Sequence, residues 1–270
     1  MNPGNVSEFL KCATKIRDSW FSADDQWGPW FRGRTDSSWE LRPKLYRKEF
    51  GGTFREARKQ NLEDEIREEF IRRAPVLCEA LPAAEPQQAE WDWYFMMQHF
   101  GAPTRLLDWT EGALIALYFA VRNNAGSNDA AVWVLDPYQL NAKATRKEEI
   151  IPPSANGVAL ADRKLVDPWL PSRFTRMRGL PELPVCIDPT HVTRRITSQH
   201  SCFTIHGTDE KSLEKRKVPH PKYGFLVKIV IPRSEVQSIE RELRLCGVNE
   251  ATIFPDLDGL GRSICARWKR

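Results

Sequence analysis

Residues 98–121 of the chain read QHFGAPTRLLDWTEGALIALYFAV, and this stretch decides the fold class. Gly101 is well placed to end the helix before it, because glycine adopts the left-handed conformation common at helix C-termini. Pro103 disfavours a helical conformation in the residue before it, so residues 102–108 are expected to be extended or turned. Residues 112–121 are apolar almost all round, which predicts a helix buried on most sides.

Strand patterns lie on both sides of this stretch. Residues 30–34, WFRGR, are aromatic and bounded by turn-forming residues, which predicts a strand. The β-branched run 131–135, AVWVL, predicts a central strand, and further strands are expected over 202–206 and 225–231. Further helices are expected from Asn5, over 54–73, 91–100 and 255–268, and between a capping box of Ser234 and Gln237 and a terminal Gly247. Helices and strands mix without strict alternation, which predicts an α+β fold, a single mixed domain with a central sheet flanked by helices.

We expect three parts along the chain and one insertion. An N-terminal helix occupies 1–27, the α+β domain 28–262, and a basic C-terminal tip 263–270. Six prolines interrupt the periodicity between residues 142 and 188, so 142–188 is expected to be an irregular insertion packed on the core. Its apolar residues suit either a lid over a pocket or a surface for a partner.

Composition narrows the class of protein. The chain has 270 residues, 41% of them hydrophobic, and a net charge of +4, too small to indicate nucleic-acid binding by itself. The longest uncharged apolar run, 112–121, is shorter than the ~20 residues of a membrane span, and the charged N-terminal residues argue against a signal peptide. Six scattered cysteines without a CxxC pair argue against a disulfide framework or a zinc site. We therefore expect a cytoplasmic protein that does not bind membranes.

Three stretches together resemble the FRG domain family, named for a Phe-Arg-Gly or Tyr-Arg-Gly motif near its N-terminus. They are 30–34 with 41–45, 98–110 running into 116–120, and 195–203 with 247–260, in the order of the family and spanning roughly residues 28 to 262. One departure is His200-Ser201, where the family usually has a glycine close after the glutamine. The resemblance implies an intracellular, mostly prokaryotic domain and brings no settled activity.

Arg32 is the sharpest single candidate for a ligand contact. A planar cation beside the bare backbone of Gly33 suits a phosphate or carboxylate that approaches closely. We expect Phe31, Arg32, Gly33 and Gln199 to bind a cofactor or substrate, with the Gln199 amide reading a base or nicotinamide edge. The structural alternatives are an arginine stacked on a tryptophan or paired with a buried carboxylate, and a glutamine satisfied by the core or backbone.

Arg105 and Asp108 form a second group. In the functional interpretation Asp108 or Glu111 is a general base and Arg105 clamps an anion, so that Arg32, Arg105, Asp108 and His99 form the catalytic set. In the structural interpretation Asp108 caps the following helix or turn and pairs with Arg105. His99 suits acid–base work near neutral pH, or hydrogen bonds to the end of its own helix.

Two aspartates, Asp256 and Asp258, stand at the expected start of the last helix. There they complement the helix dipole, and paired carboxylates also suit Mg²⁺ bound together with substrate phosphates. Capping is the favoured interpretation because no third acid is near in sequence. His200 and His206 likewise lack a third ligand, so no metal site is expected.

The favoured function is a nucleotide-directed effector with a toxin or antiviral defence role, acting by ADP-ribosyl transfer or NAD cleavage. The Phe-Arg-Gly strand looks like the aromatic-Arg-Gly strand that grips NAD phosphates in arginine-type ADP-ribosyltransferases, and 116–120 is similar to their Tyr-Phe-Ala segment. Their Glu-x-Glu loop has no counterpart here, which leaves Glu250 as a guess for the catalytic glutamate. The cofactor is otherwise unknown, with NAD as the expected substrate.

Two other functions stay open. A non-catalytic module would bind a nucleotide or nucleic acid through Arg32, Arg34, Arg42 and Lys44. They lie in 32–47, where basic residues outnumber acidic ones and aromatic residues are interleaved. It would lose affinity steeply with salt and show no turnover. A phosphodiester or nucleotide hydrolase would use Asp256 and Asp258 with Mg²⁺.

Overall fold

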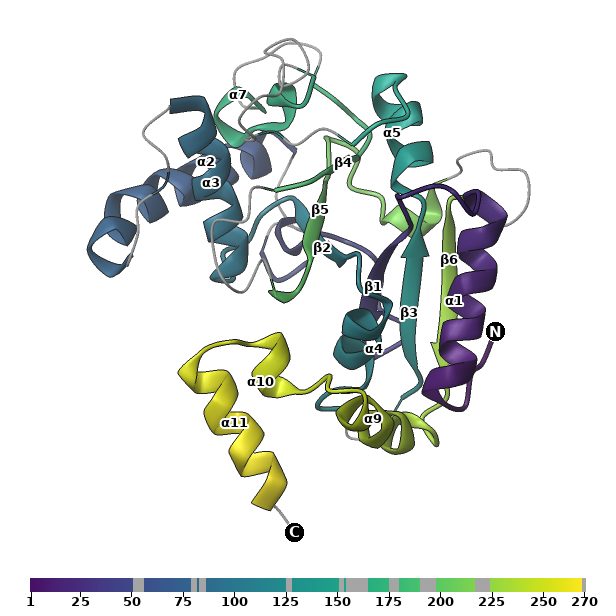
Figure 1. Cartoon of the computed structure of the whole chain (residues 1–270). Coiled ribbons are helices and arrows are strands. Elements are labelled where there is room, and N and C mark those ends of the chain that lie inside the picture. The colour runs from purple at the N-terminus through teal and green to yellow at the C-terminus, as the bar shows by residue number, and fades with distance from the viewer. Residues whose placement is uncertain are drawn as a thin grey trace.

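The computed structural model describes residues 1–50, 56–78, 82, 86–124, 128–150, 153, 165–174, 180–189, 198–216 and 224–268. Six antiparallel strands form one sheet in the order β4-β5-β2-β1-β3-β6 (Figure 1). The strands are β1 Trp30–Arg34, β2 Leu106–Thr110, β3 Ala130–Leu135, β4 Val185–Ile187, β5 Ser201–Ile205 and β6 Leu226–Ile231. With its helices this is the α+β fold that the sequence predicted.

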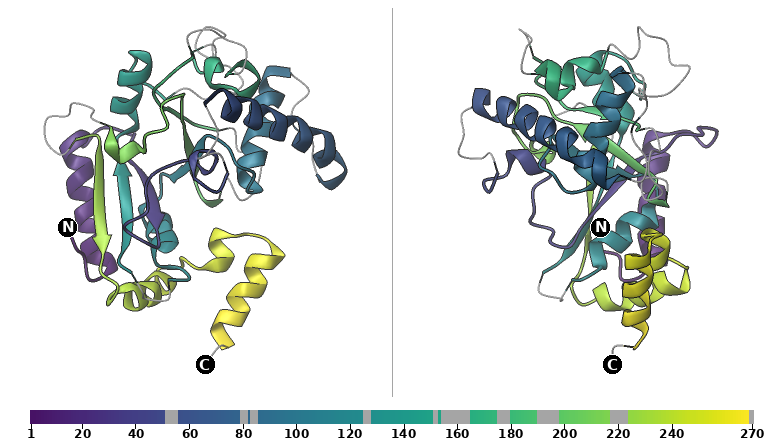
Figure 2. Two further views of the ribbon diagram at one scale, coloured as in Figure 1. Left: turned by 180° about the vertical axis from the view of Figure 1, so that it is seen from behind. Right: turned by 90° about the vertical axis from the view of Figure 1, so that its left-hand side faces the viewer.

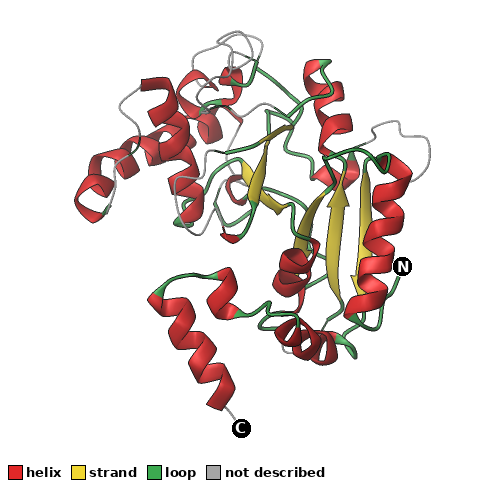
Figure 3. Ribbon diagram, viewed as in Figure 1, coloured by secondary structure: helices red, strands yellow, loops and turns green. Residues whose placement is uncertain are grey.

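Helices surround the sheet (Figure 3). They are α1 Val6–Trp20, α2 Glu56–Arg73, α3 Pro86–His99, α4 Ala113–Val121, α5 Pro137–Thr145, α7 Pro171–Phe174, α9 Val236–Leu245, α10 Glu250–Ile253 and α11 Leu257–Trp268. Short 3-10 helices are η1 Lys44–Tyr46, η2 Ala74–Leu77, η3 Asp167–Trp169 and η4 Leu213–Lys215. None of the helices described is long and apolar enough to cross a membrane.

The apolar core has three clusters, one for each half of the sheet and a third, with Trp30, Leu107 and Trp133, that spans both halves. Helices α1, α4 and α9 cover one face of β1, β3 and β6, where Phe9, Ile16 and Leu117 are fully buried. The other half packs β2, β4 and β5 against α3, with Trp91 and Phe95 at its centre. Phe95 stacks on Phe203 of β5 with ring centroids 5.3 Å apart. The C-terminal pair α10 and α11 lies to one side of both halves, and α11 packs on α10 (Figure 2).

Helix α4 lies directly on β1 because Gly33 has no side chain. A Cβ at Gly33 would lie 2.0 Å from the Ala116 carbonyl oxygen and 2.6 Å from the Ala120 nitrogen. Two small residues one helical turn apart therefore face the glycine, and the backbones touch. The helix α4 therefore occupies the space that the missing side chain leaves, while the expectation that Gly33 binds a ligand stays a prediction.

The two halves of the sheet join at a narrow seam. Strand β1 pairs with β3 over five partner pairs, and β2 pairs with β5 over five. Between β1 and β2 the register contains one pair, Phe31 with Thr110. Beyond this pair the two central strands separate, and the space between them opens on the side of Arg32 and Asp108.

Several local expectations were wrong. Asp108 lies in the middle of β2 and caps no helix; the first turn of α4 instead begins at Gly112, whose N–H donates to the Thr110 hydroxyl at 3.0 Å. The helix α9 has no side-chain cap from Ser234, whose hydroxyl donates to Glu235. The sequence also missed α10, and α11 begins at Leu257 and not at residue 255.

The segment 142–188 is less irregular than expected where it is described. It contains the end of α5, then η3, α7 and β4, and Trp169 and Val185 belong to the core around α3. Residues 151–152, 154–164 and 175–179 lie outside the described residues, so the expected lid or partner surface stays an expectation.

We expect Gly33→Ala to lower the free energy of unfolding by on the order of 3 kcal/mol, because overpacking against helix backbone forces a shift of α4. Urea denaturation followed by circular dichroism measures this. Gly28→Ala is the matched control, since a Cβ there meets nothing within 4 Å. Equal stability of the two variants would contradict the close contact between β1 and α4.

Candidate functional site

A pocket of about 390 Å³ opens where β1 and β2 separate. The pocket is also bounded by the end of α3, the end of α4, the segment before β5 and the end of α10. Its polar lining is Arg32, Arg34, Thr35, Gln98, His99, Asp108, Thr110, Arg122, Gln199 and Ser201, and its aromatic lining is Phe31, Trp39, Trp109, Phe119, Phe203 and Phe254. The lining thus holds three arginines against one carboxylate, which favours an anionic ligand with an aromatic part.

Arg32 bridges the seam between the two central strands. Its Nη1 donates to the backbone carbonyl of Asp108 and, at 3.3 Å, to the Asp108 carboxylate. The side chain is 12% exposed. The opposite edge of the guanidinium differs: the buried Nε–H has no acceptor within the described part of the chain. That edge is the one that grips an oxyanion with two parallel hydrogen bonds.

Asp108 faces the pocket as an oriented carboxylate. Arg32 holds one of its oxygens, and the Gln98 amide donates to the other at 2.9 Å. Gln98 is itself fixed, because its carbonyl oxygen accepts from the Thr104 hydroxyl. The Asp108 side chain remains 52% exposed, so a ligand can reach it.

Arg34 repeats the pattern of Arg32 two residues further along β1. Its Nη2 donates to the Glu40 carbonyl at 2.9 Å, its guanidinium lies 5.4 Å from the Trp39 ring, and its buried Nε–H has no acceptor among the described residues. Burial lowers the pKa of both arginines, and for Arg34 the neighbouring cations Arg32 and Arg47 lower it further. Two cations held together in this way leave an electrostatic cost that an anion would relieve.

Arg122 supplies a third guanidinium from the end of α4. Its Nη2 pairs with the Glu250 carboxylate at 2.8 Å, and its guanidinium lies 4.5 Å from the Phe254 ring. Its Nε–H is also buried with no acceptor in the described ranges. Local sequence patterns did not indicate a role for Arg122, because it joins the pocket through contacts made with the C-terminal part of the chain.

The other expected site residues lie at the pocket in different ways. His99 lines it from the last turn of α3, next to the Phe100 ring. Gln199 lines it too, but its amide donates to the Ile253 carbonyl at 3.2 Å. Phe31 and Gly33 form its floor, with Phe31 buried in the core. No role was predicted for Gln98, although it stands at the end of a helix in the stretch that decides the fold.

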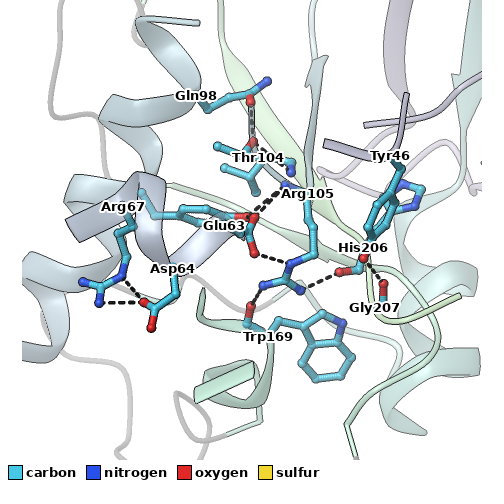
Figure 4. A network of polar contacts seen from close by, with 12 residues as sticks. Tyr46, Glu63, Asp64, Arg67, Gln98, Thr104, Arg105, Trp169, His206 and Gly207 are labelled. Carbon is cyan, nitrogen blue, oxygen red and sulfur yellow. Dashed lines mark hydrogen bonds and ion pairs between the residues drawn. The ribbon is translucent and has the colours of Figure 1, made fainter. Parts of the chain in front are cut away.

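Arg105 lies outside this pocket, fully buried in a separate network (Figure 4). Its Nε donates to the Glu63 carboxylate, Nη1 to the His206 carbonyl at 2.8 Å and Nη2 to the Trp169 carbonyl. Burial acts to lower the pKa of Arg105, but the charge and hydrogen bond of Glu63 together with Tyr94 and Tyr46 outweigh it, and the pKa is raised. Arg105 therefore pairs with Glu63 and not with Asp108, and we do not include it in the proposed site.

The aspartates considered for Mg²⁺ lie at the start of α11. The Asp256 carboxylate accepts from the Gly259 N–H at 2.6 Å, which is a capping contact. In the described part of the chain, no group of three or more His, Cys, Asp or Glu side chains is arranged to hold a metal ion. Glu111, weighed as a general base, lines a different cavity beside Tyr138 and Asp188.

We expect Arg105→Ala to lower the free energy of unfolding by about 3–5 kcal/mol, because it leaves the Glu63 carboxylate buried and unpaired. Arg73→Ala is the matched control: Arg73 is 70% exposed and pairs with Glu69 on the helix surface, a contact worth at most about 1 kcal/mol. Urea denaturation of both variants tests this, and a loss below 1 kcal/mol for Arg105→Ala would contradict the structural role.

Comparison with known proteins gives one match, to part of this chain. Comparison with curated proteins and with solved structures gave no match. A family model, the FRG domain, matches residues 28–129, a little over a third of the chain. The matched range carries Arg32, Arg34, Asp108 and Arg122, while the Gln199 and Phe254 side of the pocket lies beyond it. Residues 28–129 thus match the FRG domain model, and this range supplies the three arginines and the carboxylate of the pocket.

Proposed function

We propose that this pocket binds a nucleotide through its phosphates and that the protein cleaves NAD, releasing nicotinamide or transferring ADP-ribose. One observation supports the proposal above others: Arg32, Arg34 and Arg122 line one pocket, and each has a buried Nε–H without an acceptor among the described residues. A buried donor left unpaired costs free energy. Three such donors around one cavity favour a ligand with several anionic oxygens, such as a diphosphate.

The phosphate contacts follow from the edges that the arginines leave available. Asp108 holds Arg32 through Nη1, while the Glu40 carbonyl holds Arg34 and the Glu250 carboxylate holds Arg122, both through Nη2. A guanidinium held at one end is already oriented, so little rotamer freedom is lost when phosphate oxygens bind at the other. The diphosphate of NAD has enough oxygens to engage more than one of these groups.

Aromatic side chains supply the second half of the recognition. Trp39 is 51% exposed at the mouth of the pocket, and Phe119 and Phe254 line the wall below Arg122. An exposed ring such as that of Trp39 can stack on adenine or nicotinamide. The pocket thus offers cations for phosphates and faces for bases within one space.

Asp108 and His99 carry the chemistry in this proposal. As the bond from the ribose C1′ to nicotinamide breaks, positive charge develops on the ribose, and the oriented Asp108 carboxylate stabilises it. Water adds its oxygen to C1′ and gives up one proton, which His99 accepts; the products are nicotinamide, ADP-ribose and a proton. In ADP-ribosyl transfer an acceptor nucleophile replaces the water. Loss of cellular NAD would suit a toxin or defence role.

We expect Asp108→Asn to reduce nicotinamide release from NAD by at least about 100-fold, because the neutral amide no longer stabilises the developing charge. Mass spectrometry of NAD incubated with the protein measures this. The variant keeps the backbone carbonyl that Arg32 contacts, so the seam between the strands is preserved. Arg32→Ala should lose both NAD binding and turnover.

Arg17→Ala is the control, since Arg17 lies on α1 beside Asp18, away from the pocket. Thermal unfolding of every variant separates loss of chemistry from loss of fold. Full turnover by Arg32→Ala and Asp108→Asn, or an untouched NAD pool with the unmodified protein, would refute NAD cleavage at this pocket.

A non-catalytic nucleotide or nucleic-acid module is the second candidate. Two exposed rings support this candidate. Trp39 lies at the mouth of the pocket, and Phe100, which follows the pocket residue His99, is 65% exposed. Lys44 reaches this region too, donating to the Gly101 carbonyl at 2.7 Å. If NAD is left intact but a single-stranded oligonucleotide binds, with affinity falling steeply from 50 to 200 mM salt, this candidate replaces the first.

A further inference from the structure

The short helix α10 is followed directly by Phe254, which lines the pocket, and its N-terminus carries a capping box. The chain reaches it through Gly247, at φ +79°, and Asn249 caps it by accepting from the Ala251 N–H at 3.0 Å. The Thr252 hydroxyl completes a capping box by accepting from the Asn249 N–H at 3.0 Å. This local geometry sets the direction of Glu250 at one end of α10 and of Phe254 just after the other.

Glu250 connects three helices through its two carboxylate oxygens. Oε1 pairs with Arg122 of α4 at 2.8 Å, and Oε2 pairs with Arg262 of α11 at 3.0 Å. The Glu250 side chain is 16% exposed. Burial acts to raise the pKa of Glu250, but the nearby Tyr118 hydroxyl and the two arginines outweigh it and lower the pKa.

The opposite end of α10 is tied to the segment before β5. The Ile253 carbonyl accepts from the Gln199 amide and from the Ser198 hydroxyl, both at 3.2 Å. The next residue, Phe254, lies under the Arg122 guanidinium at 4.5 Å. The helix is therefore held at both ends, and Arg122 lies between Glu250 on one side and the Phe254 ring on the other.

We infer that Glu250 is a positioning residue, which orients Arg122 and α10 for the phosphate of a ligand. The inference rests on the proposed anion-binding role of the pocket. It assigns the C-terminal part of the chain a role in orienting the pocket's arginine. Glu250 does not line the pocket, and arginines engage both of its oxygens. It is therefore not placed to act as a catalytic glutamate.

Without Glu250, Arg122 would lose the contact that fixes its Nη2. The guanidinium would then be free to turn toward solvent, since the side chain is already 20% exposed. A glutamine at this position keeps the size of the side chain but offers a neutral oxygen to one arginine at most. A shorter aspartate keeps the charge, so it should restore part of the orientation.

The test is a calorimetric titration of inorganic pyrophosphate, a probe that needs the arginines but no NAD chemistry. We expect Glu250→Gln to weaken binding about tenfold, equivalent to ~1.4 kcal/mol. Glu250→Asp should recover part of this loss. Glu240→Gln, which removes an exposed partner of Arg244 on α9, is the matched control and should bind as the unmodified protein does.

Hydrogen–deuterium exchange without any ligand supplies the second readout. Glu250→Gln should speed amide exchange over 250–268, while Glu240→Gln should leave that segment unchanged. Equal or tighter pyrophosphate binding by Glu250→Gln would overturn the inference, as would unchanged exchange in α10 and α11 or no binding of pyrophosphate by the unmodified protein. If pyrophosphate binding falls as expected while NAD stays intact, the NAD reaction fails and the positioning role of Glu250 stands.

Discussion

The guanidinium of Arg32 joins two central strands that share one backbone partner pair, Phe31 with Thr110. Where the strands have separated, its Nη1 donates to the Asp108 carbonyl. A side-chain hydrogen bond thus joins the strands beyond their one backbone pair. The same side chain lines the pocket. One residue therefore connects the halves of the sheet and presents a cation to a ligand, which couples the site to the fold.

Two further constraints hold that seam in place. On one side, the bare Cα of Gly33 lets α4 lie on β1, and α4 carries Arg122 at its end. On the other side, the buried Arg105–Glu63 pair connects α2 to the start of β2 and to the carbonyls of Trp169 and His206 (Figure 4). This network fixes the position of β2, and with it Asp108. The FRG match covers the residues of the seam, whereas α10 and Gln199 complete the pocket from later in the chain.

Sequence patterns predicted the elements whose signal is local. The strand 30–34, the buried helix 112–121 and the strand 131–135 are confirmed, since alternation and continuous apolarity follow from which faces an element buries. Pairings between distant residues could not be predicted in this way. Arg105 stands three residues from Asp108, yet its partner is Glu63, 42 positions earlier.

In the candidate site, too, local patterns predicted some residues, and contacts between distant parts of the chain determine others. Arg32 was selected for its aromatic and glycine neighbours, and it lies at the pocket together with Asp108, His99 and Gln199. Gly33 was predicted to bind a ligand; it lines the pocket, and α4 occupies the space that its missing side chain leaves. Arg122 and Glu250 were not connected, because an ion pair between two helices leaves no periodicity in either.

The central claim, that three arginines in one pocket bind a phosphate ligand through their Nε edges, is tested most directly by NMR. The Nε–H resonances of ¹⁵N-labelled protein would be followed during a titration with ADP-ribose. The structure predicts that Arg32, Arg34 and Arg122 shift together, while Arg42 and Arg216, whose Nε groups are also buried and unpaired among the described residues but lie outside the pocket, stay unchanged. Shifts confined to other arginines, or none at all, would contradict it.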